Sequence, residues 1–370
     1  MGHGKRKKII CIANDTWADS DEKWGFNRMI TAGFQVEIWK IGAITIGTKV
    51  WDPQPYRIPS VKMKTWKQFY RILLSQDMGK TKFFFFNRYD CLNYAKMIIR
   101  IMGGEYYNIT INSVVSRSYF ENYKKVYEKK FHYMDLFPAT YNFLPSEMNK
   151  GDLQSSHEAK KKNNIVLHTY NYDCYILTEK HQEENIIENE YILFMDQNLL
   201  KHKDLVNFQV GSFVKDEERY VREINVFLNY LETYYGKEVV IAAHPTADEK
   251  TTAVYGNRRV VYGNSCQYVK YADVVVSFAS SSIDFAVLYD IPILFYFNED
   301  LKDGFLYKDF FLPKVKALKA KVLNISRLGN GVDLDRFLAD TKNYGGYLPY
   351  ITSHKTDRLF IDSVMEYIKK

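Results

Sequence analysis

Two groups of polar side chains in this chain could together bind an anion. His244-Pro245 forms one group, and Ser280, Ser281 and Ser282 form the other. An imidazole can donate a hydrogen bond to a phosphate oxygen and, when protonated, can neutralise charge that forms on a departing phosphate. Serine hydroxyls at the start of a helix add donors to the unpaired backbone N–H groups there. The residue types therefore indicate a phosphate site, with the histidine and the serines as its donors.

Each group also has a simpler interpretation. A histidine before proline is held in an extended conformation and can merely cap a loop. Ser281 with Asp284 three residues later is the pattern of a capping box, which would only start the helix predicted at residues 283–289. The anion site therefore depends on whether the two groups meet in space.

Three short apolar runs, at residues 239–243, 274–278 and 291–296, must position these groups. Unbroken β-branched runs of this length, separated by helical pieces, predict parallel strands that are buried on both faces. Ligands of open α/β sheets bind at the carboxyl ends of such strands. His244 ends the first run and the serines follow the second, so we expect them at the same edge of one sheet.

The same alternation of apolar runs and helical segments extends along the first half of the chain. The strand-like segments there are residues 8–13, 34–39, 82–86 and 106–111. A helix is predicted at residues 61–76, and a polar, lysine-rich stretch at about 138–164 predicts an interdomain linker. This pattern is typical of a Rossmann-like sheet.

A second alternation begins at Ile165. Residues 165–168 and 191–195 resemble strands, and a long amphipathic helix from Asp216 to Tyr235 ends at Gly236. A chain of 370 residues is long for one domain. We therefore predict an α/β protein with two Rossmann-like domains, at residues 1–164 and 165–352, and a C-terminal helix within residues 353–370.

The composition is that of a soluble globular protein, with 46% apolar and 26% charged residues. No apolar run is long enough for a transmembrane helix, and the start of the chain lacks the apolar core of a signal peptide, so we expect a cytoplasmic protein.

The four cysteines show no CxxC spacing, which predicts isolated reduced thiols. His168 and His202 have no metal-ligand spacing, so we expect no metal and no cofactor.

The net charge of +7 and the 30 tyrosines raise the question of an anionic partner. Basic clusters at residues 5–8 and 160–162 could attract nucleic acid or the headgroups of anionic lipids. A solvated surface or a flexible linker explains such clusters better. The chain contains no clustered aromatic and basic RNA-reading motif, so we do not expect nucleic acid as a partner.

The motifs together resemble the carboxyl-terminal domain of bacterial GT-B glycosyltransferases with HP and SS motifs, a group that includes sialyltransferases, polysialyltransferases and some Kdo transferases. The residues that carry the resemblance are His244-Pro245, 272–277, 280–282, 283–286 and Ile291-Pro292. The resemblance implies two Rossmann-like domains that face each other across a cleft, a CMP-activated sugar as donor, and inversion without a metal. It also implies that the histidine and the serines hold the nucleotide phosphate.

The chain departs from that family in its first half. Sialyltransferases of this kind carry two acidic residues followed by glycine there, and this sequence has no equivalent. The acceptor and the identity of the sugar therefore stay open. An inverting transfer still needs a base for the proton of the acceptor hydroxyl. Asp15 and Asp19, in the loop after the first predicted strand, and Asp90 are candidates, and we favour Asp15.

Asp196 and Gln197 follow the strand predicted at residues 191–195. A carboxylate and an amide there could bind hydroxyls of the sugar or the ribose, although Asp196 could equally cap a turn. Beyond them lie His202 and Asp204 in the same predicted loop. We therefore include Asp196 and Gln197 in the donor site.

Three functions fit these observations. The first is a glycosyltransferase that moves a nonulosonate or Kdo-like sugar from a CMP-activated donor to a surface glycan or glycolipid, with peripheral contact to the membrane. The second is a transferase of the same fold that uses a UDP-sugar or transfers a polyol phosphate. The third is a noncatalytic protein that binds nucleic acid or glycan, since a fold alone does not define an activity.

Overall fold

The computed structural model describes residues 7–14, 23–45, 58–86, 90–112, 115–181, 185–201, 213–302 and 304–369. The chain divides into two compact units. Unit 1 comprises Met1–Ser113, Glu121–Tyr170 and Thr352–Lys370, and unit 2 comprises Val114–Phe120 and Asn171–Ile351. The chain thus enters unit 2 twice, briefly at Val114–Phe120 and then at Asn171–Ile351, and it ends in unit 1.

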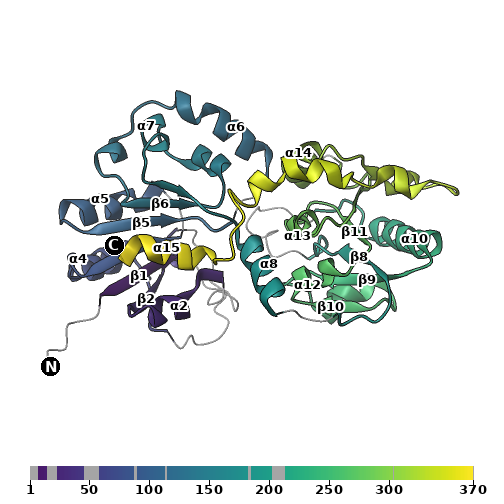
Figure 1. Ribbon diagram of the computed structural model, residues 1–370, viewed down its shortest axis with the longest axis horizontal. Coiled ribbons are helices and arrows are strands. Elements are labelled where there is room, and N and C mark those ends of the chain that lie inside the picture. The colour runs from purple at the N-terminus through teal and green to yellow at the C-terminus, as the bar shows by residue number, and fades with distance from the viewer. Residues whose placement is uncertain are drawn as a thin grey trace. The chain divides into compact units, whose positions relative to one another are not determined.

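Unit 1 is built on a parallel sheet that has seven strands among the described residues, in the order β3-β2-β1-β4-β5-β6-β7 (Figure 1). The winding reverses between β1 and β4, as in Rossmann-like sheets. The strands are β1 (Lys8–Ala13), β2 (Gln35–Lys40), β3 (Ser60–Lys62), β4 (Thr81–Phe85), β5 (Glu105–Ile109), β6 (Tyr141–Leu144) and β7 (Asn164–Val166).

Apolar side chains cover both faces of this sheet. Ile9 and Cys11 point into one core layer, and Ile10 and Ile12 point into the other, because successive side chains of a strand alternate between its faces. The first layer includes side chains of α2 and α15, and the second includes side chains of α4 and α5. The helices of unit 1 are α2 (Phe26–Thr31), α3 (Gly42–Thr45), α4 (Trp66–Leu74), α5 (Asn93–Ile101), α7 (Ser156–Ala159) and α15 (Phe360–Lys369), with 3₁₀ turns at Asp90–Leu92, Val126–Glu128, Tyr133–Leu136 and Glu147–Asp152.

The C-terminal helix α15 belongs to the core of unit 1. Its residues Phe360, Val364, Met365 and Ile368 are buried in the layer that also holds Ile9. Figure 1 shows α15 beside the sheet of unit 1. The helix predicted within residues 353–370 is therefore confirmed, and it completes the first apolar layer.

Unit 2 contains a parallel sheet with six strands among the described residues, in the order β10-β9-β8-β11-β12-β13. Strands β8, β9, β11 and β12 confirm the apolar runs of the sequence, and nearly all of their residues are buried. The bounds are β8 (Tyr191–Met195), β9 (Glu238–Ala243), β10 (Val260–Tyr262), β11 (Val274–Ser277), β12 (Ile293–Phe297) and β13 (Leu323–Asn324).

The longest helix of the described part of unit 2 is α10 (Glu217–Tyr235). The Asp216 side chain caps its start by accepting from the N–H of Arg219, and Gly236 ends it with a φ of 65° that favours glycine. Both ends agree with the sequence prediction.

The other helices are α8 (Tyr170–His181), α11 (Glu249–Thr252), α12 (Ser265–Lys270), α13 (Ile283–Leu288) and α14 (Leu312–Ala317), while α6 (Arg117–Lys125) has residues in both units. Short turns complete the described chain: 3₁₀ turns at Ala253–Tyr255, Ile325–Arg327, Leu334–Phe337, Thr341–Gly346 and Leu348–Tyr350, and a π-helical segment at Leu306–Phe311.

The structure differs from the sequence prediction between residues 138 and 181. The stretch predicted as a linker contains β6, which extends the sheet of unit 1. The strand predicted to open the second domain is β7, and it pairs with β6 in that same sheet. The main crossing to unit 2 follows Tyr170, within α8, a helix that the sequence did not predict. Residues 61 and 62, predicted as the start of a helix, belong to β3.

Candidate functional site

The carboxyl ends of β8, β9 and β11 lie at one edge of the sheet of unit 2. Strands β9 and β10 follow β8 on one side, and β11, β12 and β13 lie on the other, so the winding reverses between β8 and β11. Ligands of open α/β sheets bind outside the carboxyl ends at such a reversal. The predicted residues Asp196, His244 and Ser280 each come directly or shortly after one of these three strands, and hydrogen bonds connect their loops.

Asp196 fixes the loop after β8. Its Oδ1 accepts hydrogen bonds from the N–H of Asn198 and from the hydroxyl of Tyr255, both at 2.7 Å, and its Oδ2 accepts from the N–H of His244 at 3.4 Å. Asn198 adopts a φ of 50°, a left-handed conformation that asparagine tolerates. Burial, and secondarily the charge of Asp196, raise the pKa of Tyr255 well above its ordinary value, so the hydroxyl stays a donor.

The buried carboxylate of Asp196 thus serves the protein itself. The sequence suggested that it binds hydroxyls of a sugar or ribose. In the structure both of its oxygens accept bonds from protein groups on three different segments. Asp196 is therefore a positioning residue, which holds the backbone of His244 at the end of β9.

The ring of His244 is oriented by Thr246. The backbone N–H of Thr246 donates to Nδ1 at 3.2 Å, and the Thr246 hydroxyl lies 2.8 Å from the same atom. A nitrogen that accepts from an N–H carries no proton, so in the neutral ring the proton is on Nε2, which is a hydrogen-bond donor. Asn198 donates to the Thr246 hydroxyl at 3.4 Å and connects this arrangement to the Asp196 loop.

Gln197 connects the loop after β8 to the loop after β11. Its Oε1 accepts a 2.7 Å hydrogen bond from the N–H of Ala279, the residue directly before Ser280. The amide of Gln197 therefore holds the start of the serine segment. The sequence placed Gln197 in the donor site as a ligand group, and the structure shows a contact that sets the position of the serines.

The serine segment is a turn that leads into α13. Ser281 is exposed, and Ser280 and Ser282 are partly buried. The Oγ of Ser280 accepts from the N–H of Ser282 at 3.2 Å, so this hydroxyl stabilises the turn. The helix α13 has six residues, so the serine side chains and the N–H groups of the turn, rather than a long helix dipole, are the donors that it offers.

The predicted capping box between Ser281 and Asp284 is wrong. The N-terminal end of α13 has no side-chain cap, because the carboxylate of Asp284 points into the protein. There it accepts hydrogen bonds from Asn171 at 2.8 Å and from the hydroxyl of Tyr347 at 3.3 Å. Asn171 also donates to the carbonyl of Ser281, so it ties α8 to the serine turn.

A buried lysine supports the same turn. Lys314 of α14 donates to the carbonyl of Ala279, and burial lowers the pKa of Lys314 to about 8, while Asp284 opposes the shift. Burial raises the pKa of Asp284 to about 6, and Asn171, Lys314 and Tyr347 oppose that shift. Two oppositely charged groups therefore lie beneath the serine turn, although the sequence did not single out either of them as a site residue.

Ser277, at the end of β11, is a further polar group at this edge. It is fully buried, and its Oγ has no hydrogen-bond partner among the described residues. A serine that ends an apolar run is the sequence signal that could have identified it.

Several predicted residues lie outside the described part of the chain: Asp15, Asp19, His202 and Asp204. Asp15 as catalytic base therefore stays a prediction. Asp90 is described, and it lies in unit 1, where it lines a small polar pocket. His168 is buried in unit 1, where it bridges to Thr352.

In the described residues, no group of three or more His, Cys, Asp and Glu side chains is arranged to hold a metal ion. Among the same residues, no helix combines the length and the apolar character needed to cross a membrane.

Comparison with known proteins bears on the fold. No protein-family model and no curated protein sequence matches the chain. The structure is similar to UDP-GlcNAc 2-epimerase from Methanocaldococcus jannaschii, with a TM-score of 0.51 and 11% identity, over 98% of this chain and 100% of the epimerase. It is also similar to the wall teichoic acid polymerase TagF, with a TM-score of 0.53 and 10% identity, over 98% of this chain and 89% of the polymerase.

A variant of TagF that was soaked with CDPG gives a TM-score of 0.50 and 11% identity over the same shares of the two chains. Identities this low establish a shared fold and nothing about activity. Together with the two parallel sheets, the similarity confirms the predicted α/β fold of two Rossmann-like domains of the GT-B class.

Proposed function

We propose that the chain is a metal-independent, inverting glycosyltransferase that moves a nonulosonate or Kdo-like sugar from a CMP-activated donor to a surface glycan or glycolipid. The observation that supports it is that the loop of His244 and the serine turn are both hydrogen-bonded to the loop after β8, at one edge of the unit 2 sheet. Gln197 connects the loop after β8 to the serine turn, and Asp196 connects the same loop to His244.

The proposed role of these groups is to bind the phosphate of the nucleotide. His244 offers its Nε2–H, and the serine turn offers hydroxyls and N–H groups. Donors that are fixed before the reaction stabilise the charge that develops on a departing phosphate. We assign this role to the neutral form of His244. Its Nε2–H is already a donor, and protonation of Nδ1 would break the hydrogen bond that Nδ1 accepts from the N–H of Thr246. Asp15 is the proposed base for the acceptor hydroxyl.

A second candidate uses the same site with another donor. The structures of similar fold include a UDP-GlcNAc 2-epimerase and a teichoic acid polymerase that was soaked with CDPG. A UDP-sugar transferase or a polyol-phosphate transferase would also place a nucleotide phosphate between the histidine and the serines. The base of the nucleotide therefore separates the two candidates.

The experiment is a binding series with CMP, UMP, UDP and CDP, measured by thermal shift and by calorimetry. CMP is expected to raise the melting temperature of the wild type. Loss of one hydrogen bond to a charged group corresponds to about 1.5–3 kcal/mol, so His244→Ala and the pair Ser281→Ala/Ser282→Ala should each weaken CMP binding roughly 10-fold or more. His354→Ala and Ser75→Ala are matched controls in unit 1, where both side chains are exposed.

The outcomes separate the candidates. Preference for UMP or UDP would replace the CMP donor by the second candidate, and preference for CDP would favour the polyol-phosphate branch. A wild type that binds none of the nucleotides, or variants that bind CMP as tightly as the wild type, would overturn the phosphate site.

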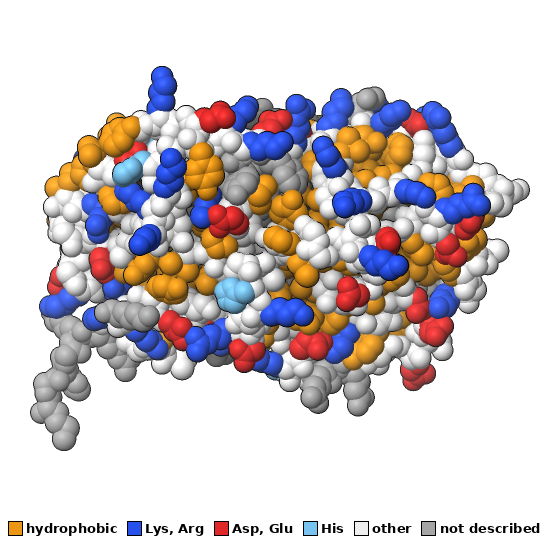
Figure 2. All heavy atoms as spheres, turned by 45° about the horizontal axis from the view of Figure 1, so that its top comes forward, with side chains coloured by type: hydrophobic (Ala, Val, Ile, Leu, Met, Phe, Trp, Pro, Cys, Tyr) orange, Lys and Arg blue, Asp and Glu red, His pale blue; other side chains and the backbone are white. Residues whose placement is uncertain are grey.

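Contact with the inner face of a membrane belongs to the same proposal. A segment of unit 1, residues 124–136, exposes apolar and basic side chains together. Phe131 and Leu136 are 64% and 67% exposed, and Lys124, Lys125 and Lys130 are exposed near them in the sequence. Figure 2 shows basic side chains interspersed with hydrophobic ones over the face that it presents. Such a combination suits the surface of an anionic bilayer.

A further inference from the structure

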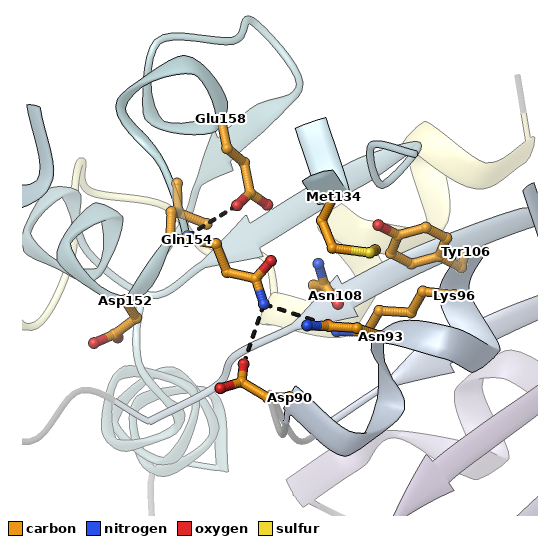
Figure 3. A pocket seen from close by; sticks show the side chains of 10 residues that line it. Asp90, Asn93, Lys96, Tyr106, Asn108, Met134, Asp152, Gln154 and Glu158 are labelled. Carbon is orange, nitrogen blue, oxygen red and sulfur yellow. Dashed lines mark hydrogen bonds between the residues drawn. The ribbon is translucent and has the colours of Figure 1, made fainter. Parts of the chain in front are cut away.

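Unit 1 contains a small polar pocket near the start of α5 (Figure 3). Its cavity volume is about 70 Å³. Side chains from α5, from β5, from the 3₁₀ turns at Asp90–Leu92 and Tyr133–Leu136, and from the segment that precedes and begins α7 line it. These side chains are Asp90, Asn93, Lys96, Tyr106, Asn108, Met134, Asp152, Leu153, Gln154 and Glu158.

A chain of asparagines determines which atom of Asn108 is left for a ligand. The amide of Asn164 donates to the carbonyls of Glu158 and Ala159, so its Oδ1 must accept. Asn142 donates to that oxygen at 2.8 Å, which leaves the Oδ1 of Asn142 as an acceptor. Asn108 donates to this oxygen at 2.7 Å. The two backbone carbonyls therefore determine which amide atom donates and which accepts in all three asparagines.

The series of asparagines ends at the Oδ1 of Asn108. The side chain is 5% exposed, and among the described residues this oxygen has no hydrogen-bond partner. A buried acceptor without a partner costs about 1–3 kcal/mol. Asn108 lines the pocket, and Figure 3 shows it among the other pocket side chains. The pocket therefore needs a group that donates a hydrogen bond to Asn108.

The rest of the wall also favours a donor. Gln154 donates to Asp90 and to Asn93, each at 3.3 Å, and so holds the carboxylate of Asp90 at the pocket. Asp152 and Glu158 add two more carboxylates to the lining, although Asp152 also accepts from Asn149, and Glu158 accepts from the N–H of Gln154 and from Asn142. Carboxylates only accept when ionised, so a ligand with several donors matches this wall.

Lys96 brings a positive charge to the same wall. It is 5% exposed, and its ammonium lies 5.1 Å from the ring centre of Phe85 and 5.9 Å from that of Tyr106. Three carboxylates against the ammonium groups of Lys96 and of nearby Lys129, whose charge interacts with Asp152 and Glu158, leave one net negative charge, which disfavours a phosphate. The buried ammonium in turn disfavours a second cation. The best match is a neutral group with hydroxyls, packed against Tyr106 and Met134.

We propose that this pocket is a subsite for a hydroxyl-bearing neutral group, namely one edge of a sugar ring or a polyol, whose hydroxyl donates to Asn108. Its assignment to the acceptor glycan rests on the proposed function. The binding itself does not, because the pocket lies wholly within unit 1 and shares no residue with the nucleotide site of unit 2.

The test is saturation-transfer NMR on the full chain with a panel of defined probes. The neutral probes are glycerol, glucose, galactose and N-acetylglucosamine, and inorganic phosphate and ethanolamine are the charged probes. The variants are Asn108→Leu, which removes the buried acceptor, and Gln154→Ala, which changes a partly exposed side chain and is the safer choice for folding. Gln68→Ala is the matched control, because Gln68 is in unit 1 and does not line the pocket.

We expect a signal from at least one neutral probe that falls about 10-fold in Asn108→Leu and several-fold in Gln154→Ala, and that Gln68→Ala leaves unchanged. Should Asn108→Leu fail to fold, Gln154→Ala decides. The proposal is overturned by a wild type that binds no neutral probe, by signals that both variants leave intact, or by phosphate or ethanolamine as the probe that the variants affect.

A parallel CMP titration separates this proposal from the proposed function. Both pocket variants should bind CMP as the wild type does. Probe binding that depends on Gln154 and Asn108 in a chain that fails to bind any nucleotide would retain the pocket and reject the transferase. Nucleotide binding without probe binding would retain the transferase and reject the pocket.

Discussion

The side-chain oxygen of Gln197 accepts a hydrogen bond from the backbone N–H of Ala279, and this one contact joins the two loops that flank the winding reversal of the unit 2 sheet. The residue after Ala279 begins the serine turn. Lys314 binds the carbonyl of Ala279 from α14. Both polar backbone groups of Ala279 are thus held by side chains, so the turn has a defined position before any ligand arrives.

Replacement of Gln197 tests the value of this positioning. Gln197→Ala should weaken CMP binding about 5–10-fold, because the loss of one hydrogen bond of about 1 kcal/mol frees the turn, which must then be ordered on binding. Gln197→Glu still accepts from the N–H of Ala279 but places a negative charge beside the phosphate, so it should weaken binding further with little effect on melting. Calorimetry with CMP measures both; equal affinity in all three proteins would show that the contact does not position the site.

The buried carboxyl of Asp284 should make stability depend on pH. Its pKa is about 6 in the folded protein against an ordinary value of 3.8, mainly because of burial, while Asn171, Lys314 and Tyr347 oppose the shift. Between these values the folded chain keeps a proton that the unfolded chain has lost. Stability should therefore fall as the pH rises from about 4 to about 6, by an amount on the order of 3 kcal/mol.

Asp284→Asn removes this titration. Urea unfolding of wild type and variant, measured at steps between pH 4 and pH 7, should show the variant gaining stability relative to the wild type as the pH rises. Asp77→Asn is the control, because the Asp77 carboxylate is largely exposed and pairs with Lys80. Parallel curves for Asp284→Asn and wild type would mean that this carboxyl titrates normally.

Gly25 is predicted to be intolerant of any side chain. It has a φ of 66°, and a Cβ at this position would collide with the side chain of Ile361 in α15. Gly25→Ala should therefore destabilise unit 1 by about 2–4 kcal/mol, part from the left-handed backbone and part from overpacking. Gly33→Ala is the control, since its φ is 95° but nothing lies within 4 Å of its Cβ position.

Thermal melting of the two variants gives the comparison. Gly33→Ala should lose only the backbone part of the effect. Adding Ile361→Ala to Gly25→Ala should recover some stability, because it removes Cγ1 and Cγ2, two of the three atoms of Ile361 that a Cβ at Gly25 would meet. If the two glycine variants melt together, the packing of α15 against Gly25 is not what the structure describes.

The exposed segment at residues 124–136 should bind anionic vesicles. Each lysine near an anionic bilayer contributes about 1 kcal/mol, so the triple change Lys124→Gln/Lys125→Gln/Lys130→Gln should weaken binding to phosphatidylglycerol vesicles roughly 100-fold. Vesicle sedimentation measures it, with Phe131→Ser as a separate test of the apolar contribution.

The matched control changes three other exposed lysines of unit 1, Lys64, Lys67 and Lys80, to glutamine. It should retain most of the binding, and CMP affinity should be unaffected in every variant. Equal losses in the two triple variants would reduce the effect to net charge, and would remove the segment from the proposal.

Much of the fold follows from local signals in the sequence. The apolar runs that became β9, β11 and β12 were legible because central parallel strands are buried on both faces. Gly236 predicted the end of α10 because a left-handed helix end favours glycine. The strands β10 and β13 were not predicted, since each is a short edge strand of two or three residues.

The parts that could not be predicted depend on distant partners. The stretch at 138–164 is rich in polar residues, yet it contains β6 because the edge of an existing sheet accepts it. The strand predicted at residues 165–168 exists as β7, but it pairs with β6 instead of opening the second sheet. The helix α8 has no continuous apolar stripe and buries Asp173 and Thr178 beside Tyr172 and Ile176, so its periodicity is lost.

The candidate site shows the same division. His244 and the serines were identified because each follows an apolar run. The capping box failed because Asp284 meets Asn171 and Tyr347, which are 113 and 63 residues away in sequence. Spacing within one segment cannot reveal such partners.

The position of α15 has a consequence for synthesis. A ribosome releases β1 and α2 early, yet the helix that shields their apolar layer is translated after all of unit 2. This apolar layer of the nascent chain stays uncovered during most of elongation. In that interval it is exposed to chaperones and to aggregation. Unit 1 is therefore the first to be translated and the last to be completed.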